Sequence, residues 1–295
     1  MIYIMAFLLI LEGSLFLEKE VFMKAHHVIP AQYCFALDFK NYNERVVHYS
    51  DFSVLYYQFT TLISDQTIVI ADGCADFQFC CDASQQSAVL WGSVVTPTTI
   101  NYQPEKTYCG IRISTSISRK ISYLPYSELI NQGVSFGDIV QNGSSFLDDL
   151  YCATDFSSRV KVLETWLIQS GMLEDSSLDQ IDHCIDKIIN SRGAMRIADI
   201  SDDIGISERL LRKKFNQAIG MSPKQYSRIV RFQDVINDIL YGETFNKKHH
   251  TDFMDFSYYD DSHLIKDFKY FTQMTPSWFV KEMLDVNMTR YRNEG

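Results

Sequence analysis

Residues 197–226 read IADISDDIGISERLLRKKFNQAIGMSPKQY, and this stretch decides the fold of the C-terminal part of the chain. It begins with isoleucines at helical spacing, and Gly205 follows where a left-handed helix end favours glycine. Ser207 is a typical N-cap residue for a second helix, whose buried face we expect to contain Leu211 and Phe215. A helix, a glycine-containing turn and a capped second helix together predict a helix-turn-helix unit.

The second helix of this unit, predicted for Glu208–Gln217, turns a basic face outward. An α-helix fits the major groove of DNA, where arginine and lysine side chains donate to guanine O6 and N7. Base contacts are therefore expected from Arg209, Arg212, Lys213 and Asn216. Phosphate contacts, which position such a unit, are expected from Ser207, Lys214, Lys224, Arg228 and Arg231.

A second copy of the pattern follows. Residues 258–269, YYDDSHLIKDFK, repeat the serine–leucine–phenylalanine spacing of the first unit, shortened at the cap, and Gln273–Pro276 repeats Gly220–Pro223. The long helix predicted from Pro223 to Tyr241 spans roughly 27 Å, so that two recognition helices can reach successive major grooves, which lie about 34 Å apart. In the second unit we expect base contacts from Ser262, His263 and Lys266, and a phosphate contact from Lys269.

The charge of the chain is unevenly distributed. The formal net charge is −10, yet residues 1–189 carry 11 basic and 22 acidic side chains, whereas residues 190–295 carry 16 and 15. Arg209–Arg231 holds seven basic residues and no acidic one. An acidic total argues against nucleic acid as a partner, but a local basic segment favours it for the second half. The alternative interpretation of such a segment is a solvated helix face.

At these motifs the chain resembles the AraC/XylS family of transcription regulators. The segments that carry the resemblance are Gly205–Phe215, Gly220–Tyr226, Arg228–Phe232 and Tyr258–Lys269. The resemblance covers about residues 197–279, and it implies a bipartite seven-helix DNA-binding domain joined to an N-terminal domain that senses a ligand or dimerises. It also implies promoter DNA as a partner, a homodimer, a small-molecule effector, contact with RNA polymerase, and a cytoplasmic regulator that is neither an enzyme nor dependent on a cofactor.

The second unit departs from the family pattern. Ser257 and Gln273 stand where glycines are usual, and the short helix expected at residues 252–256 is one residue short. Asp260, Asp261 and Asp267 lie at or in the second recognition helix. Because carboxylates repel phosphates, we expect the second unit to contribute less DNA affinity than the first.

The first half of the chain predicts a different fold. Short β-branched and aromatic runs alternate with turn-prone clusters, which is typical of an antiparallel sandwich or barrel such as a cupin-like domain. Asp72-Gly73 has the sequence of a hairpin turn. The whole chain is expected to be α+β, with four parts: an apolar extension (1–22, with Met23 an alternative start), a β-rich sensor domain (23–145), a helical connector that packs internally or against a second subunit (146–190), and the DNA-binding domain (191–295). The apolar run at residues 1–11 is too short to span a bilayer.

Cysteines and histidines offer a rival chemistry. Cys74, Cys80 and Cys81 lack the paired spacing of a structural zinc site, and alternation places Cys74 and Cys80 on one strand face, where thiols act as small apolar groups. The histidine pairs at 26–27 and 249–250 have no partners that complete a metal site. The remaining alternative is a thiol-based redox or metal sensor, or an enzymatic module, in the N-terminal half.

Overall fold

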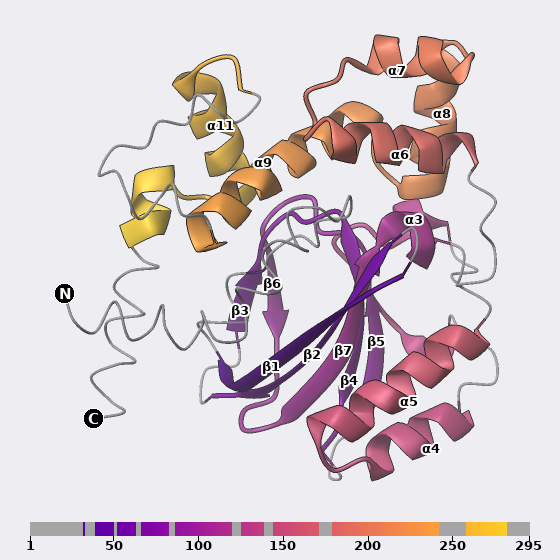
Figure 1. The fold of residues 1–295 in the computed structure, drawn as a ribbon. Coiled ribbons are helices and arrows are strands. Elements are labelled where there is room, and N and C mark those ends of the chain that lie inside the picture. Colours follow the sequence, from indigo (N-terminus) through magenta and orange to yellow (C-terminus); the bar gives the residue numbers. More distant parts are fainter. Residues whose placement is uncertain are drawn as a thin grey trace.

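The computed structural model describes residues 32, 39–49, 52–62, 66–82, 86–119, 125–138, 144–170, 179–241 and 258–281. A β-sheet unit lies at the centre of the molecule, and helices from the second half of the chain lie across one end of it (Figure 1). Four predictions fall outside the described residues: the extension 1–22, the histidine pairs at 26–27 and 249–250, and the short helix at 252–256. Among the described helices, none is long and apolar enough to cross a membrane.

The central sheet has six strands, each antiparallel to its neighbours, in the order β1-β2-β7-β4-β5-β8. The strands are β1 (Phe39–His48), β2 (Ser53–Thr61), β7 (Thr107–Ser114), β4 (Cys74–Cys80), β5 (Ser87–Trp91) and β8 (Gly133–Ser135). A second sheet pairs β3 (Gln66–Val69) with β6 (Thr98–Asn101). Apolar runs bounded by turn residues thus form strands, as the sequence predicts.

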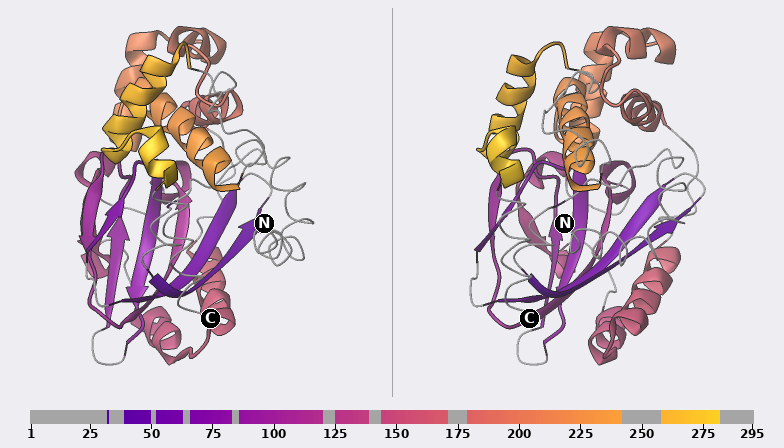
Figure 2. Two further views of the ribbon diagram at one scale, coloured as in Figure 1. Left: turned by 90° about the vertical axis from the view of Figure 1, so that its left-hand side faces the viewer. Right: turned by 60° about the vertical axis from the view of Figure 1, so that its left-hand side comes forward.

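Both faces of the six-stranded sheet are covered, and its strand β4 is therefore buried along its whole length. One face packs against α4 (Ser144–Cys152) and α5 (Phe156–Gln169) in a core that contains Phe77 and Trp166. The other face packs against the two-stranded sheet in a core that contains Phe59. The N-terminal half is thus a sandwich of a large and a small sheet with two helices outside, and Figure 2 shows this layering from two further sides.

Of the two architectures expected for the β unit, the sandwich is confirmed and the barrel is wrong, and the expected hairpin at Asp72-Gly73 is also wrong. The large sheet is open, because β1 and β8 are its two edges and do not pair with each other within the described residues, so that no closed barrel forms. Asp72-Gly73 does not close a hairpin, because β3 and β4 on either side of it lie in different sheets. β7 pairs with β2 and β4, which are distant from it in sequence, and short apolar runs carry no signal for such pairing.

The second half is helical and shares one core. Its elements are α6 (Gln180–Asn190), α7 (Ile197–Ile204), α8 (Glu208–Ile219), α9 (Pro223–Tyr241), α11 (Asp261–Thr272) and a last helix at 276–281. Leu211, Phe215, Phe232 and Phe268 are buried together in this core. The two connector helices divide between the cores, since α5 packs on the sheet and α6 packs with the later helices. Their apolar stripes therefore pack internally.

The β unit and the helical unit meet at the loop between β3 and β4. Ile70 and Ala71 of this loop belong to the helical core, and the Gln233 side chain of α9 donates to the Ala71 carbonyl at 2.5 Å. A methyl group at Gly73, whose φ is +66°, would lie 3.1 Å from the ring of Tyr226. A second contact joins Arg119, just after α3 (Thr115–Ser118), to the carboxylates at the start of α6, Asp179 and Asp182, at 2.9 and 2.8 Å.

Candidate nucleic-acid interface and effector pocket

The first helix-turn-helix unit forms as the sequence predicts. Helix α7 ends at Gly205, whose φ of 74° is left-handed and whose N–H donates to the carbonyls of Ser201 and Asp202. The Ser207 hydroxyl then caps α8 by accepting from the Leu210 N–H at 3.3 Å. Gly220 ends α8 with a φ of 79°. These local bonds fix the turn, and the buried face of α8 fixes the rotation of the helix about its axis.

The outward face of α8 carries all four residues predicted to read bases. Leu211, Phe215 and Ile219 are fully buried on the opposite face. Arg209, Arg212, Lys213 and Asn216 are exposed. The Arg212 side chain is 60% exposed and forms a salt bridge with Glu208, one helical turn before it. An exposed pair of this kind contributes little stability, so the guanidinium can exchange Glu208 for an acceptor on DNA at small cost.

The residues predicted to contact phosphates have diverse surroundings. Lys224 is exposed at the first turn of α9, whereas the exposed Lys214 donates to the Gln180 side chain of α6 at 2.7 Å. The Ser207 hydroxyl oxygen accepts the hydrogen bond that caps α8. The guanidinium of Arg231 lies over the ring of Tyr258, 5.5 Å from its centroid, and links α9 to the segment before α11. Arg231 is therefore a structural contact as well as a candidate phosphate ligand.

Arg228 has a structural partner that the sequence did not suggest. Its guanidinium lies 2.7 Å from the carboxylate of Asp267 on α11, and it also lies over the rings of Tyr270 and Phe271. Asp267 is only 2% exposed. The expectation that Asp267 repels phosphate is therefore wrong, because its charge is buried and paired. The Arg228 guanidinium is therefore paired, its side chain is only 30% exposed, and it is not a free surface cation.

Of the second predicted unit, the structure describes the recognition helix α11, whose cap differs from that of α8. Asp260, not Ser262, caps α11 by accepting from the His263 N–H at 2.7 Å. Ser262, Lys266 and Lys269 are exposed, and the His263 ring packs edge-on against Tyr258. Gln273 ends the helix with a φ of 63°, so a left-handed end forms here without glycine.

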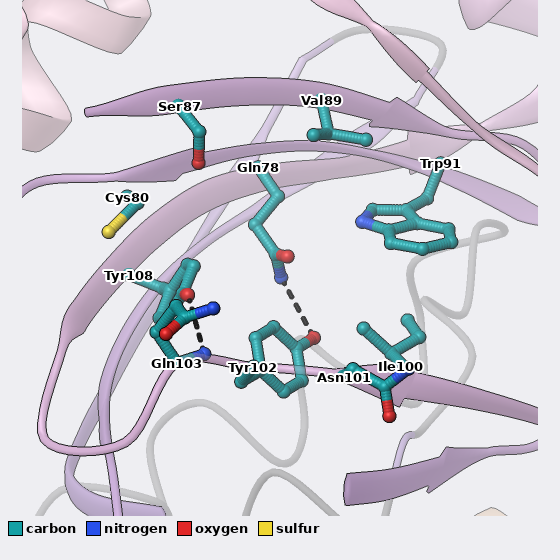
Figure 3. Close-up of a pocket in the computed structure, with 10 residues that line it drawn as sticks. All are labelled: Gln78, Cys80, Ser87, Val89, Trp91, Ile100, Asn101, Tyr102, Gln103 and Tyr108. Carbon is teal, nitrogen blue, oxygen red and sulfur yellow. Dashed lines mark hydrogen bonds between the residues drawn. The ribbon is translucent and has the colours of Figure 1, made fainter. Parts of the chain in front are cut away.

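A pocket of about 210 Å³ lies between the two sheets of the β unit. Figure 3 shows that its walls come from the large sheet on one side and from β6 and the segment after it on the other. Polar and aromatic groups line it, among them Gln78, Trp91, Tyr102 and Tyr108. Gln78 donates to the Tyr102 hydroxyl at 3.1 Å. The buried indole N–H of Trp91 has no hydrogen-bond partner among the described residues, which leaves a donor for a bound molecule.

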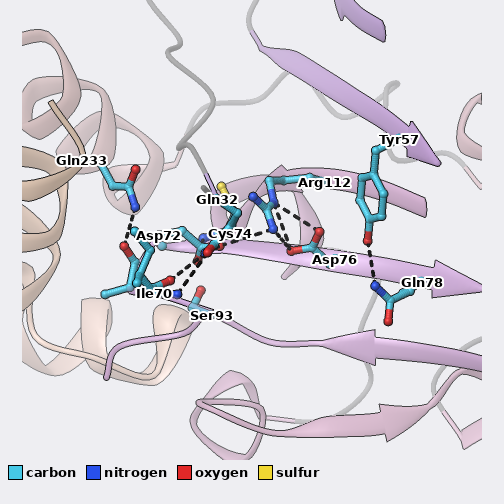
Figure 4. A network of polar contacts seen from close by, with 12 residues as sticks. Gln32, Tyr57, Ile70, Asp72, Cys74, Asp76, Gln78, Ser93, Arg112 and Gln233 are labelled. Carbon is cyan, nitrogen blue, oxygen red and sulfur yellow. Dashed lines mark hydrogen bonds and ion pairs between the residues drawn. The ribbon is translucent and has the colours of Figure 1, made fainter. Parts of the chain in front are cut away.

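A buried charge network lies between this pocket and the helical unit (Figure 4). Arg112, 2% exposed, donates to both carboxylate oxygens of Asp76 at 3.0 to 3.1 Å and lies 3.7 Å from Asp72. Gln32 donates to Asp72 at 2.9 Å and to the Ile70 carbonyl at 2.6 Å. Burial raises the pKa of Asp72 to about 6, although the charge of Arg112 opposes this rise. The network therefore holds the loop that touches α9.

Little in the sequence predicts this network. The sequence predicts a hairpin turn at Asp72, and Arg112 stands 36 positions after Asp76, with no motif to connect them. An arginine within a strand-like run, GIRI, is the one usable signal, since arginine is almost never fully buried without a partner. No group of three His, Cys, Asp or Glu side chains that could hold a metal ion is found among the described residues.

Comparison with known proteins gives one match to a family model. Residues 190–227 match the model of bacterial regulatory helix-turn-helix proteins of the AraC family. No curated protein sequence shows a significant match. Among solved structures, ToxT from Vibrio cholerae O395 is 14% identical, with 82% of this chain and 98% of that chain covered and a TM-score of 0.40. The P21 crystal form of Vibrio cholerae ToxT is 15% identical with the same coverage and a TM-score of 0.41.

ToxT with a bound unsaturated fatty acid, from Vibrio cholerae strain SCE256, is 14% identical, with 83% of this chain and 92% of that chain covered and a TM-score of 0.39. The family match covers α7, α8 and the turn between them, where the structure forms the cap, the glycine end and the exposed basic face described above. The resemblance stated from the motifs is thus confirmed for this segment, since residues 190–227 match the AraC-family helix-turn-helix model.

Proposed function

We propose that the protein is a transcription regulator that binds promoter DNA through α8 and α11 and senses a small molecule in its β unit. The observation that supports DNA binding is the exposed basic face of α8. The opposite, apolar face of this helix is buried, and the helix is capped at both ends. A rigid helix with this face fits the major groove. Arg209, Arg212, Lys213 and Asn216 read bases in this proposal, joined by Ser262, His263 and Lys266 of the second unit.

Phosphate contacts in the proposal come from Ser207, Lys214, Lys224, Arg231 and Lys269. Arg228 has a different role in it, which is to hold α11 against α9 through Asp267. The Arg228–Asp267 pair and the Arg231–Tyr258 contact set the position of the second unit relative to the long helix. Assembly into a homodimer, contact with RNA polymerase and a cytoplasmic location stay predictions from the sequence.

The pocket between the sheets is the proposed effector site. Its volume of about 210 Å³ exceeds the roughly 150 Å³ of an engineered protein cavity that binds benzene, so a small organic molecule fits. Gln78, Trp91 and Tyr102 line this pocket, and they also border the cavity next to Arg112 and Asp76. If a bound ligand moves these side chains, the movement is passed through Arg112 to Asp72. The neighbouring Ala71 carbonyl accepts from Gln233, so the effect extends to α9. Binding one conformation more tightly than the other is how an effector shifts DNA affinity.

The test is binding of the full-length protein to labelled DNA from upstream of its own gene, with scrambled DNA of equal length as the control, at two salt concentrations. Selective binding that weakens steeply with salt is the expected result, since each neutralised phosphate contributes about −0.9 to the slope of log K against log salt. The proposal is contradicted if the protein binds both DNAs with equal affinity at both salt concentrations, and still does so when a library of small organic molecules is present.

A further inference from the structure

Two cysteine thiols of neighbouring strands lie in contact on the helix-covered face of the large sheet. The sulfur of Cys81, directly after β4, is 3.1 Å from the sulfur of Cys109 on β7. Phe79 is opposite Cys109 in the strand register, so Cys81 stands two residues further along the same face, as a diagonal neighbour. Cys109 is almost fully buried and Cys81 is half-buried, so the Cys81 side is the more exposed side of the pair.

A buried cation, Arg159, interacts electrostatically with both thiols. Arg159 of α5 is 8% exposed and donates to the Gln58 side chain at 2.5 Å, while its Nε–H has no hydrogen-bond partner among the described residues. The hydrogen bond from Cys109 holds the pKa of the Cys81 thiol below its ordinary value, and the charge of Arg159 lowers it further against the effect of burial. Burial raises the pKa of Cys109 well above the ordinary value. The two thiols are thus unequal, with Cys81 the one that ionises first.

We propose that Cys81 and Cys109 form a dithiol that hydroperoxides oxidise reversibly to an intramolecular disulfide. The Cys81 thiolate attacks the O–O bond, which breaks as a sulfur–oxygen bond forms, and the departing oxygen takes up a proton to leave as water or an alcohol. Cys109 then attacks the sulfenic sulfur, so that the S–S bond forms, the S–O bond breaks, and the released hydroxide leaves as water with the Cys109 proton. Two thiols are oxidised and one hydroperoxide is reduced.

The geometry distinguishes this pair from the other described cysteines. A disulfide requires sulfurs about 2.0 Å apart, which needs an approach of roughly 1 Å from the present contact. Cys80 is next in sequence, but it faces the opposite side of β4, where it packs in the core with Tyr108. Cys74 stands at the far end of β4, about 20 Å from Cys80 at 3.3 Å per residue. Cys74, Cys80 and Cys81 are close in sequence, but the thiol that contacts Cys81 is that of Cys109.

The proposal goes beyond DNA binding and does not depend on it. The full-length protein is reduced, freed of reductant and treated with hydrogen peroxide at a small molar excess, and its free thiols and peptide masses are then measured. We expect two thiols to disappear together, with one linked pair of peptides that contains Cys81 and Cys109, and dithiothreitol to restore both thiols. A disulfide between other cysteines, or oxidation of Cys81 with no link to Cys109, overturns the proposal.

Variants separate the roles of the two thiols. Cys109→Ser stops the reaction at the sulfenic acid of Cys81, which dimedone labels, whereas Cys81→Ser gives neither the label nor the disulfide. Cys80→Ser is the matched control, because it changes the adjacent thiol on the opposite face and should leave disulfide formation at the wild-type rate. Dimedone labelling of Cys109 in Cys81→Ser at the rate seen for Cys81 would contradict the assignment of Cys81 as the attacking thiol.

The role of Arg159 has its own readout. The rate of alkylation of Cys81 by iodoacetamide is measured as a function of pH. In Arg159→Gln the pH profile should shift to higher pH and the rate at neutral pH should fall about tenfold, while Arg159→Lys should stay close to the wild type. A pH profile reports ionisation of the thiol, which a purely structural role of Arg159 does not move. An unchanged profile in Arg159→Gln, with a circular dichroism spectrum like that of the wild type, contradicts a role for this cation.

Discussion

The guanidinium of Arg228 on α9 and the carboxylate of Asp267 on α11 lie 2.7 Å apart and join α11 to the long helix. Asp267 is buried at 2% exposure, and 39 residues separate the partners in sequence. A buried carboxylate is stable only when paired, so this contact ties the position of α11 to the long helix. Arg228 and Arg212 are both arginines of the basic segment, yet the first faces the interior and the second faces solvent.

Arg228→Ala should therefore affect stability more than DNA binding. Loss of the partner leaves Asp267 buried and unpaired, and we expect the free energy of unfolding to fall by about 2 to 3 kcal/mol, less than the roughly 3 to 5 kcal/mol of a fully buried pair, because 30% of the Arg228 side chain is exposed. Arg212→Ala removes only an exposed pair with Glu208 and should cost less than about 1 kcal/mol. Urea denaturation of both variants checks this, and equal losses would contradict the buried role of Arg228.

The two recognition helices should contribute unequally to DNA affinity. Asp260 and Asp261 remain at the start of α11, whereas the start of α8 has only Glu208, which pairs with Arg212. Arg212→Ala should therefore weaken binding to the upstream DNA more than Lys266→Ala does. Fluorescence anisotropy titrations at one fixed salt concentration measure both variants. An equal loss of affinity in the two variants would show that the acidic start of α11 has no effect.

Asp72 gives the stability of the protein a specific dependence on pH. Its pKa rises from an ordinary value of 3.8 to about 6 in the fold, mainly through burial. The folded state then binds the proton more tightly than the unfolded state, so the contribution of Asp72 to stability falls as pH rises from about 4 to 6, by no more than roughly 3 kcal/mol. Asp72→Asn should remove this component and flatten the curve. Urea denaturation between pH 4 and 7 tests it, and parallel curves for both proteins would refute the assignment.

Two glycines with left-handed backbones make a matched pair at the ends of α7 and α8. A methyl group at Gly205 meets nothing within 4 Å, whereas one at Gly220 would lie 2.9 Å from the Tyr126 carbonyl oxygen and from Ser127 of the β unit. Gly205→Ala should cost about 1 kcal/mol from backbone conformation alone. Gly220→Ala should cost roughly 1 to 3 kcal/mol more, because the added group presses against the 3₁₀ turn η1 (Tyr126–Glu128). Thermal denaturation of both variants measures the difference.

Local rules predicted the helical half well. The bounds of α8 differ from the prediction by two residues at one end, and Gly205 and Ser207 act as expected, because caps and glycine ends depend on a few adjacent residues. The outward face of α8 also followed from spacing alone. These features carry the candidate DNA interface.

Long-range pairing accounts for what the sequence did not predict. The Arg112–Asp76 pair and the Arg228–Asp267 pair each join residues more than 30 positions apart, and β2 pairs with β7 across a still longer separation. Periodicity reports which side of an element is buried, but not which element covers it. For that reason Arg228 was expected on a phosphate, and the contact between Cys81 and Cys109 had no signal in the spacing of cysteines along the chain.

The most direct test of the account is the salt dependence of DNA binding in two variants that each lose three positive charges. Arg209→Ala, Arg212→Ala and Lys213→Ala together remove the exposed basic face of α8, whereas Lys40→Ala, Arg45→Ala and Lys161→Ala remove three exposed charges from the β unit and its helix α5. The account predicts that the α8 variant loses its preference for upstream over scrambled DNA, while the β-unit variant keeps both the preference and a slope close to that of the wild type. Equal effects of the two variants would mean that net charge alone governs binding and would contradict the proposed interface.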